Sequence, residues 1–186
     1  MAAKSMPHPK AFLRDFKGGR MSRDMSLFRD DDGKVYHLGA SEVNATLRIR
    51  LLTDDATQSS GKYVRVFTGA SREAPAVFKK DGHYYLFSSG CTGWSPNAAD
   101  VAVADTMLGE WKSLGNPVRG TDQERRTTFG GQSTHVLPVA GLPGQFVFMG
   151  DLWRPKNAID GRYLRLPVEF ENGTPVLRRS NAWSLK

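Results

Sequence analysis

The sequence predicts an all-β protein built from short antiparallel strands. Segments rich in β-branched and aromatic residues alternate with turn signals along the whole chain, as in KVYHLGA, TLRIRLL and HYYLFSS. No long segment shows the 3.6-residue apolar spacing of an amphipathic helix. The dipeptides Asp32-Gly33, Asp81-Gly82 and Asn172-Gly173 separate such segments, and they favour the positive φ angles of tight hairpin turns.

The expected strands follow one another in groups that are separated by these turns. A further turn is expected near Pro143-Gly144. In chain order, the expected strands cover residues 25–28, 34–40, 46–52, 62–67, 75–80, 83–89, 100–105, 135–140, 145–153, 162–170 and 175–180.

An internal repeat organises these strands. SRDMSLFRDDDGKVYHLGAS and SREAPAVFKKDGHYYLFSSG align with one deletion, so that Gly33 and Gly82 are 49 positions apart, as are Asp24 and Glu73. A third segment, GGQSTHVLPVAGLPGQFVFMGDLW, matches less well and has Gln132 near the position of the acids. A period of about 50 residues of antiparallel strands is typical of β-propeller blades. A β-sandwich formed by duplication is the alternative.

The repeat places two carboxylates at equivalent positions of successive blades. The first strand of each propeller blade lines the central axis, so Asp24 and Glu73 are expected to converge there. Paired acids suit acid–base cleavage of a glycosidic bond, because the charge of one carboxylate raises the pKa of the other. Without the repeat, the SREA segment would be interpreted as an exposed charged loop.

Several residues near these acids suit a sugar ligand. Trp94 offers an aromatic face, although it could instead fill an interface between blades. Asp151 and Trp153 follow an aromatic strand and could complete the rim of the site, although Asp151 could instead cap a turn. The candidates for hydrogen bonds to sugar hydroxyl groups are Glu42, Asn44, Thr92 and Asn97.

The composition excludes several other classes of protein. The formal net charge is +7, but the 26 Lys and Arg residues form no run longer than two, so we expect no nucleic-acid partner. No segment has the apolar length of a membrane-spanning helix or of a signal peptide, so no membrane partner is expected and the location stays open. The single cysteine, Cys91, is expected to be a buried thiol, and no disulfide framework or Cys-rich zinc site is possible.

No cofactor or metal site is expected. The four histidines lack metal-ligand spacing. The acidic run Asp30-Asp31-Asp32-Gly33 lacks the spaced ligands of a calcium loop and is interpreted as a hairpin turn, so a structural calcium ion has no support. Motifs for nucleotide binding and for serine hydrolases do not occur.

Taken together, the motifs resemble glycoside hydrolase family 43, and within it the exo-β-1,3-galactanase-like group. SRDMSLFRDDDGKVYHLGASEVNATLRI, SREAPAVFKKDGHYYLFSSGCTGWSPN, FGGQSTHV, GDLWRP and GRYLRLPVEF carry the resemblance, which covers roughly residues 18–183. The resemblance implies a five-bladed β-propeller and hydrolysis of β-1,3-linked galactan or arabinogalactan with inversion. It also implies that Glu73 is the general acid, that Asp24 orients it and tunes its pKa, and that Gln132 takes the water-activating place.

Family members carry further motifs in blades that precede this region. The resemblance therefore implies about three of five blades, with residues 1–20 as outer strands of a preceding blade and with blades at 21–70, 71–120 and 121–186. An incomplete propeller is expected to expose apolar blade faces, through which the chain could self-associate. The alternative to an active hydrolase is a non-catalytic carbohydrate-binding propeller fragment. Relatives are commonly secreted or periplasmic.

Overall fold

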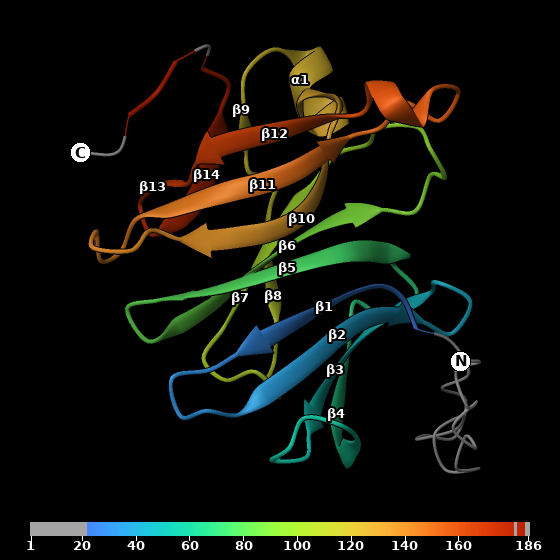
Figure 1. The fold of residues 1–186 in the computed structure, drawn as a ribbon, viewed down its shortest axis with the longest axis vertical. Helices are drawn as coiled ribbons and strands as arrows, with labels where there is room; N and C mark the ends of the chain where they lie inside the picture. Colours follow the sequence, from blue (N-terminus) through green and yellow to red (C-terminus); the bar gives the residue numbers. More distant parts are fainter. Residues whose placement is uncertain (1–21, 181, 185–186) are drawn as a thin grey trace, which may run out of the picture.

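The structure is a computed structural model that describes residues 22–180 and 182–184, and most of the described chain is β-strand (Figure 1). The predicted outer strands at residues 1–20 lie outside the described residues. The first four-stranded sheet contains β1 (Arg23–Arg29), β2 (Val35–Ser41), β3 (Thr46–Leu52) and β4 (Ser59–Val66). The second contains β5 (Arg72–Lys80), β6 (His83–Gly90), β7 (Asp100–Ala104) and β8 (Lys112–Gly115).

Two three-stranded sheets complete the described strands. The third sheet has the order β10 (Gln132–Pro138), β11 (Phe146–Leu152) and β12 (Arg162–Pro167). The fourth has the order β13 (Glu169–Glu171), β14 (Thr174–Arg178) and β9 (Val118–Arg119), with β14 and β9 parallel. Between β9 and β10 lie α1 (Asp122–Thr127) and the 3-10 turn Thr128–Gly130, and a second 3-10 turn, Ala158–Asp160, precedes β12.

The prediction of an all-β chain with propeller-type blades is confirmed. The first sheet lies within residues 21–70 and the second within 71–120, while residues 121–186 contribute to two sheets rather than one. Strand β13 of the fourth sheet begins directly after Val168. The backbone N–H of Val168 still bonds to the carbonyl of Phe146 in β11, at 2.9 Å. The division of the chain into blades stays a prediction.

The hairpin turns have the geometry that their sequences favour. Asp81 and Gly82 have φ angles of 50° and 81°, and Asn172 and Gly173 have 49° and 78°, so both residues of each turn are left-handed. Gly33 also has a positive φ, but it lies in a longer loop. In this loop the Gly33 N–H bonds to the carbonyl of Asp30, and the Asp30 N–H bonds to the carbonyl of Lys34. These turns fix the register of β1 with β2, of β5 with β6 and of β13 with β14.

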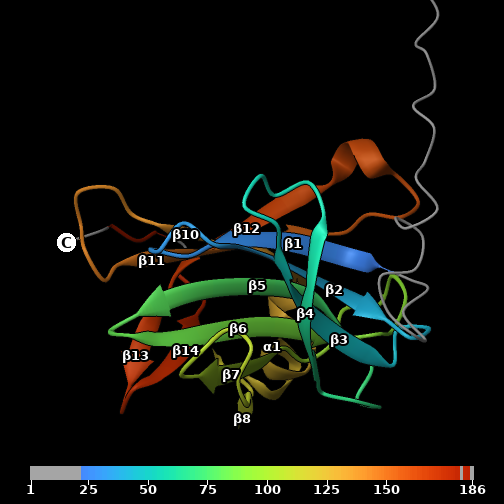
Figure 2. The same ribbon diagram turned by 90° about the horizontal axis from the view of Figure 1, so that it is seen from below.

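The first strands of three successive sheets lie side by side, with β5 between β1 and β10 (Figures 1 and 2). Hydrogen bonds join these strands through serine hydroxyls. Ser26 of β1 donates to the carbonyl of Pro75 at 2.7 Å, and Ser133 of β10 donates to the carbonyl of Ala74 at 2.6 Å. The inner strands therefore meet around β5, as the repeat predicts.

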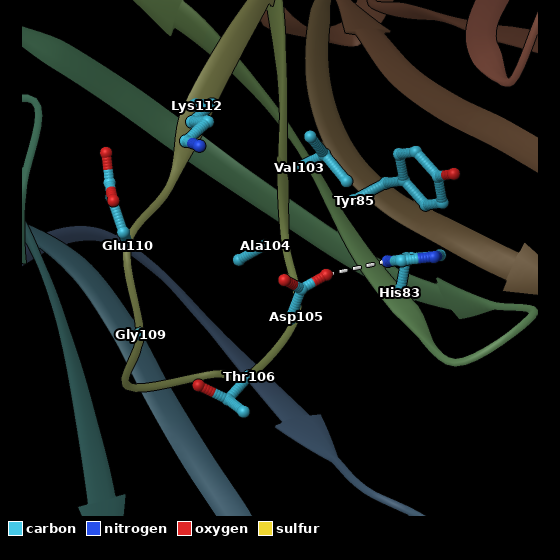
Figure 3. A pocket seen from close by; sticks show the side chains of 9 residues that line it. All are labelled: His83, Tyr85, Val103, Ala104, Asp105, Thr106, Gly109, Glu110 and Lys112. Atoms are coloured by element: carbon cyan, nitrogen blue, oxygen red, sulfur yellow. Dashed lines mark hydrogen bonds and ion pairs between the residues drawn. The ribbon is translucent and has the colours of Figure 1, made fainter.

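A cavity of about 500 Å³ lies on the outer part of the second sheet, at the end of β6 that begins with His83 (Figure 3). His83 Nδ1 and Asp105 Oδ1 are 2.9 Å apart beside it. The other residues that line this cavity are Tyr85, Val103, Ala104, Thr106, Gly109, Glu110 and Lys112. None of the predicted site residues lines the cavity.

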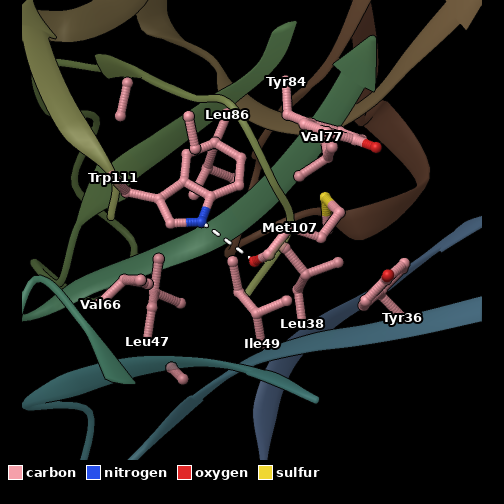
Figure 4. Close-up of a cluster of buried hydrophobic side chains, with 13 residues drawn as sticks. Tyr36, Leu38, Leu47, Ile49, Val66, Val77, Tyr84, Leu86, Met107 and Trp111 are labelled. Carbon is pink, nitrogen blue, oxygen red and sulfur yellow. Dashed lines mark hydrogen bonds between the residues drawn. The ribbon is translucent and has the colours of Figure 1, made fainter. Parts of the chain in front are cut away.

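The second sheet is buried on both faces. Successive side chains of its strands point to opposite faces, and each face packs against a neighbouring sheet. Val77 and Leu86 pack with Leu38 and Ile49 of the first sheet in one apolar cluster, and the buried Trp111 belongs to the same cluster (Figure 4). On the opposite face a second cluster joins side chains of the second sheet to the third and fourth sheets, and it includes Ala76, Phe78, Phe87, Val136, Phe148, Leu166 and Leu177. Strands β5 and β6 therefore hold a fixed position between their neighbours.

A polar network adds to the contact between the first two sheets. Asp30, at the end of β1, is 9% exposed and accepts hydrogen bonds from Lys79 Nζ at 2.8 Å and from the Tyr84 hydroxyl. Burial alone would raise the pKa of Asp30, but these bonds outweigh it and lower the pKa. The buried carboxylate is therefore paired, as a buried charge must be.

Candidate active site

The first strands of the first and second sheets carry a bulge where their acidic residues lie. The register of β1 shifts between Arg23 and Ser26, and that of β5 shifts between Glu73 and Ala76. Asp24 and Ala74 have φ angles of 42° and 53°, which are uncommon for residues other than glycine. A bulge re-aims the side chains beside it, and such backbone strain is concentrated at functional sites.

Asp24 and Glu73 are brought together as predicted. Their carboxyl groups lie within hydrogen-bonding reach of one another. Glu73 is only 8% exposed, whereas Asp24 is exposed. Burial is the main cause that raises the pKa of Glu73, and Asp24 raises it further, while hydrogen bonds from Cys91 and Gln132 act in the opposite direction. The net result is a carboxyl group that keeps its proton to a higher pH than usual.

Gln132, at the start of β10, reaches the same carboxyl group from the third sheet. Its Nε2 donates to Glu73 Oε1 at 3.1 Å and to Ser89 Oγ at 2.8 Å. Its Oε1 accepts a hydrogen bond from Trp153 Nε1 at 3.2 Å. The third predicted residue therefore contacts the acid directly and links it to an aromatic side chain.

The position of Gln132 depends on a glycine in the neighbouring strand. Gly150 of β11 lies opposite Ser133 in the register, and a Cβ atom at Gly150 would approach the carbonyl oxygen of Gln132 to 2.8 Å. Such contacts are too short for real Cβ atoms, so any larger residue would displace the Gln132 backbone. The GDLW segment thus supports the site through its glycine as well as its tryptophan.

Trp94 and Trp153 form an exposed aromatic pair beside these polar groups. Their ring centroids are 5.1 Å apart with an angle of 73° between the rings, and they are 63% and 41% exposed. The exposure of Trp94 argues against the alternative that it fills an interface between blades. An exposed aromatic pair next to a few placed polar groups is typical of a ligand-binding surface.

Asn97 and Thr92 use their polar atoms within the loop that carries Trp94. Asn97 Oδ1 accepts from the Gly90 N–H at 2.8 Å, and its Nδ2 donates to the Gly90 carbonyl at 2.8 Å and to Thr92 Oγ1 at 2.7 Å. The Thr92 hydroxyl donates to the carbonyl of Ser95 at 2.7 Å. In this structure both side chains shape the loop, and neither has an unused hydrogen to donate to a sugar.

Glu42 is likewise bound by neighbouring side chains. Its carboxylate accepts hydrogen bonds from Arg65 at 2.6 Å, from Arg48 at 2.5 Å and from the Thr46 hydroxyl at 3.0 Å. Arg65 and Arg48 hold the pKa of Glu42 down to about 2. These contacts give Glu42 a structural position at the end of the first sheet, between β2 and β3.

Asn44 and Asp151 lie at the edge of the cluster. Asn44 Nδ2 donates to Cys91 Sγ at 3.4 Å, and Asn44 Oδ1 is buried with no hydrogen-bond partner among the described residues. Asp151 of β11 pairs with Gln132 in the strand register, and burial raises its pKa. Asn44 thus contacts Cys91 and has a buried, unpaired oxygen, while Asp151 lies next to Gln132.

Three contacts of the site were not predicted from the sequence. Cys91 is exposed and lies close enough to Glu73 to lower its pKa, so the expectation of a buried structural thiol is wrong. Ser89 is 4% exposed and bonds to Gln132. Thr128 is 1% exposed, and its hydroxyl joins the carbonyl of Asn97 to the N–H of Ala99, which ties the Trp94 loop to the segment before Gln132.

No group of three or more His, Cys, Asp or Glu side chains arranged to hold a metal ion occurs in the part of the chain that the structure describes. Among the same residues, no helix has the length and apolar character required to cross a membrane.

Comparison with known proteins shows the class to which this fold and site belong. The model of the glycosyl hydrolases family 43 matches residues 8–174. The chain therefore belongs to glycosyl hydrolase family 43, and the resemblance seen in the sequence is confirmed. A comparison with curated proteins returned no match.

Solved structures extend this result. The chain is 53% identical to a family 43 β-1,3-galactosidase solved with galactodeoxynojirimycin, with a TM-score of 0.85, and covers 47% of it with 89% of its own length. It is 35% identical to an exo-β-1,3-galactanase from Clostridium thermocellum, with a TM-score of 0.75, and covers 34% of it with 85% of its own length.

A third structure contains an oligosaccharide. The exo-β-1,3-galactanase from Phanerochaete chrysosporium, solved with β-1,3-galactotriose, is 30% identical with a TM-score of 0.80, and 89% of this chain covers 37% of it. The chain thus spans less than half the length of each of these three structures.

Proposed function

We propose that this chain carries catalytic residues of a glycoside hydrolase that cleaves β-1,3-linked galactan or arabinogalactan with inversion. The observation that carries the proposal is the environment of Glu73, a buried carboxyl group whose pKa is raised and which lies against Asp24 and Gln132. A general acid must hold its proton at the working pH, and burial together with a neighbouring carboxylate has that effect.

Each of the three residues has a distinct role in this proposal. Glu73 donates its proton to the glycosidic oxygen as the bond to the anomeric carbon breaks. Asp24 keeps Glu73 protonated and oriented. The amide oxygen of Gln132 accepts a hydrogen bond from the attacking water, which adds to the opposite face of the sugar. The water's second proton passes to solvent, and Glu73 regains a proton from solvent.

The aromatic pair and nearby polar groups supply the binding surface. Trp94 and Trp153 offer exposed ring faces for the apolar side of a galactose unit. Asp151, which is partly exposed and pairs with Gln132 in the strand register, has acceptor capacity for a sugar hydroxyl, whereas the unpaired Oδ1 of Asn44 is buried. The galactose-type ligands in the related structures are in keeping with this choice of substrate.

One contact supports a second candidate, a chain that binds galactan without cleaving it. Gln132 Nε2 lies 3.1 Å from Glu73 Oε1, and the amide oxygen is only two bonds from that nitrogen. The two groups are therefore closer than the roughly 6.5–9.5 Å that separates the catalytic groups of an inverting enzyme. Catalysis requires a sugar and a water to displace this contact, whereas a binding protein could keep it.

Incubation of the full chain with β-1,3-galactotriose distinguishes the two candidates. The hydrolase releases galactose, and proton NMR of the first product shows the α-anomer because the reaction inverts the β-linkage. The binding protein gives heat of binding in calorimetry but no galactose. The absence of both turnover and binding would contradict both candidates for this chain.

A further inference from the structure

The Gln132 amide group has a separate partner for each of its polar positions. An amide nitrogen has two hydrogens to donate, and its oxygen has two lone pairs that accept. The nitrogen has two acceptors, Glu73 Oε1 at 3.1 Å and Ser89 Oγ at 2.8 Å. The oxygen accepts from Trp153 Nε1 at 3.2 Å. One lone pair of the oxygen therefore stays available for a water molecule, while the nitrogen has no hydrogen left to donate.

Ser89 is buried where it meets the amide. It lies in β6 directly opposite Glu73 of β5 in the register, so both acceptors of the Gln132 nitrogen come from one pair of neighbouring strands. Its side chain is 4% exposed. The adjacent Ser88 points to the other face of the sheet, where its hydroxyl accepts from Arg72 Nε at 3.1 Å. The two consecutive serines thus have separate partners.

We infer that Ser89 is a positioning residue that fixes the orientation of the Gln132 amide, so that its oxygen faces the attacking water. This inference rests on the proposed function of Gln132. The contact between Gln132 and Glu73 must lengthen when a sugar enters, since inversion needs a wider separation of the catalytic groups. Ser89 then remains as the buried acceptor of the amide nitrogen, and it prevents the amide from rotating its nitrogen towards the water.

Glutamine side-chain NMR tests the orientation without any need for turnover. The chain has four glutamines, Gln58, Gln123, Gln132 and Gln145, so a sample labelled with ¹⁵N-glutamine gives few side-chain signals. A Gln132→Leu sample identifies the signals of Gln132. In the wild type we expect two well-separated amide protons that exchange slowly with water. In Ser89→Ala, one of the two protons moves upfield and its exchange becomes faster.

Matched variants separate this effect from a general loss of structure. Ser89→Thr keeps the hydroxyl and is expected to keep the wild-type signals. Ser89→Cys, which is close to serine in shape, weakens the acceptor and is the substitute if the alanine variant does not fold. Ser41→Ala removes another buried hydroxyl, one that bonds to the Thr46 carbonyl in the first sheet, and should leave the Gln132 signals unchanged. Unchanged signals in folded Ser89→Ala would overturn the inference.

Kinetics on β-1,3-galactotriose add the functional readout. Ser89→Ala should lower kcat roughly tenfold, with KM within about twofold of the wild type, because the hydrogen bond orients a group that acts in the transition state. Ser89→Thr should restore kcat. An unchanged kcat in Ser89→Ala would contradict the positioning role. A wild-type chain without turnover counts against the proposed hydrolysis, and the NMR result then decides the orientation by itself.

Discussion

Gln132 Nε2 donates a hydrogen bond to Glu73 Oε1 over 3.1 Å, although the two residues are 59 positions apart in the sequence. They come from the first strands of two successive sheets, and the packing of β10 against β5 brings them together. Asp24 reaches Glu73 from the first strand of the remaining four-stranded sheet. The site therefore exists only because three sheets place their inner strands side by side.

The first prediction concerns the titration of Glu73. Asp24→Asn removes a negative charge next to the Glu73 carboxyl group and should lower its pKa towards the ordinary value of 4.5, although burial should keep it above that value. Carbon NMR of a sample labelled with ¹³C-glutamate measures the titration. Asp31→Asn, a change at an exposed residue far along the hairpin, serves as the control. A Glu73 titration that does not move in Asp24→Asn would contradict the role given to Asp24.

The second prediction concerns stability. A carboxyl group whose pKa is raised by folding contributes stability below its unfolded pKa, and this contribution is lost as the pH rises through the folded pKa. Loss of the Glu73 proton is more costly in the folded state than in the unfolded state, so Glu73→Gln should raise the Tm relative to the wild type as the pH rises above 4.5. The advantage should vanish well below about pH 4.5, where Glu73 is protonated in both states. Thermal unfolding at several pH values checks this, and a lower Tm of Glu73→Gln at pH 7 would contradict it.

The third prediction has the opposite sign and concerns Glu42. Its pKa is lowered to about 2 by Arg65 and Arg48, so its contribution to stability is present above pH 4.5 and is lost as the pH falls towards 2. Glu42→Gln should cost about 1–3 kcal/mol of unfolding free energy at pH 7, a range that allows for the exposure of Arg65. Urea unfolding measures the difference. Glu110→Gln, a change at an exposed residue, should have almost no effect.

The fourth prediction concerns the aromatic pair. Trp94 is 63% exposed, so Trp94→Ala should leave the Tm nearly unchanged while it weakens the binding of β-1,3-galactotriose roughly tenfold. Calorimetric titration measures the affinity. Leu27, which is 61% exposed in β1, gives a matched control in Leu27→Ala, whose affinity should equal that of the wild type. Equal affinity in Trp94→Ala and the wild type would remove Trp94 from the binding surface.

Much of the fold could be predicted from the sequence, because local rules determine it. The alternation of apolar residues predicted most strands, and the Asp81-Gly82 and Asn172-Gly173 turns have the φ angles that hairpins need. The repeat of 49 positions predicted that Asp24 and Glu73 meet. The pairing of β9 with β14 could not be predicted, since the two strands are short and far apart in the sequence.

The supporting contacts of the site could not be predicted from the sequence, for a different reason. Ser89 and Thr128 act through hydrogen bonds and Cys91 through its proximity to Glu73, and all three depend on strand register, on bulges and on the path of one loop. Asn97 and Thr92 were expected to bind sugar, but the same loop uses their polar atoms. A polar residue near a site can serve the ligand or the loop, and only the geometry distinguishes the two.

The most direct test of Glu73 as the general acid asks whether the loss of kcat in Glu73→Ala depends on the leaving group of the substrate. Kinetics are compared for Glu73→Ala and the wild type on β-1,3-galactobiose and on a dinitrophenyl β-galactoside, whose leaving group needs no proton. If Glu73 is the general acid, kcat on galactobiose falls by roughly 10²–10⁴-fold while kcat on the activated substrate changes little. An equal loss of activity on both substrates would contradict the account.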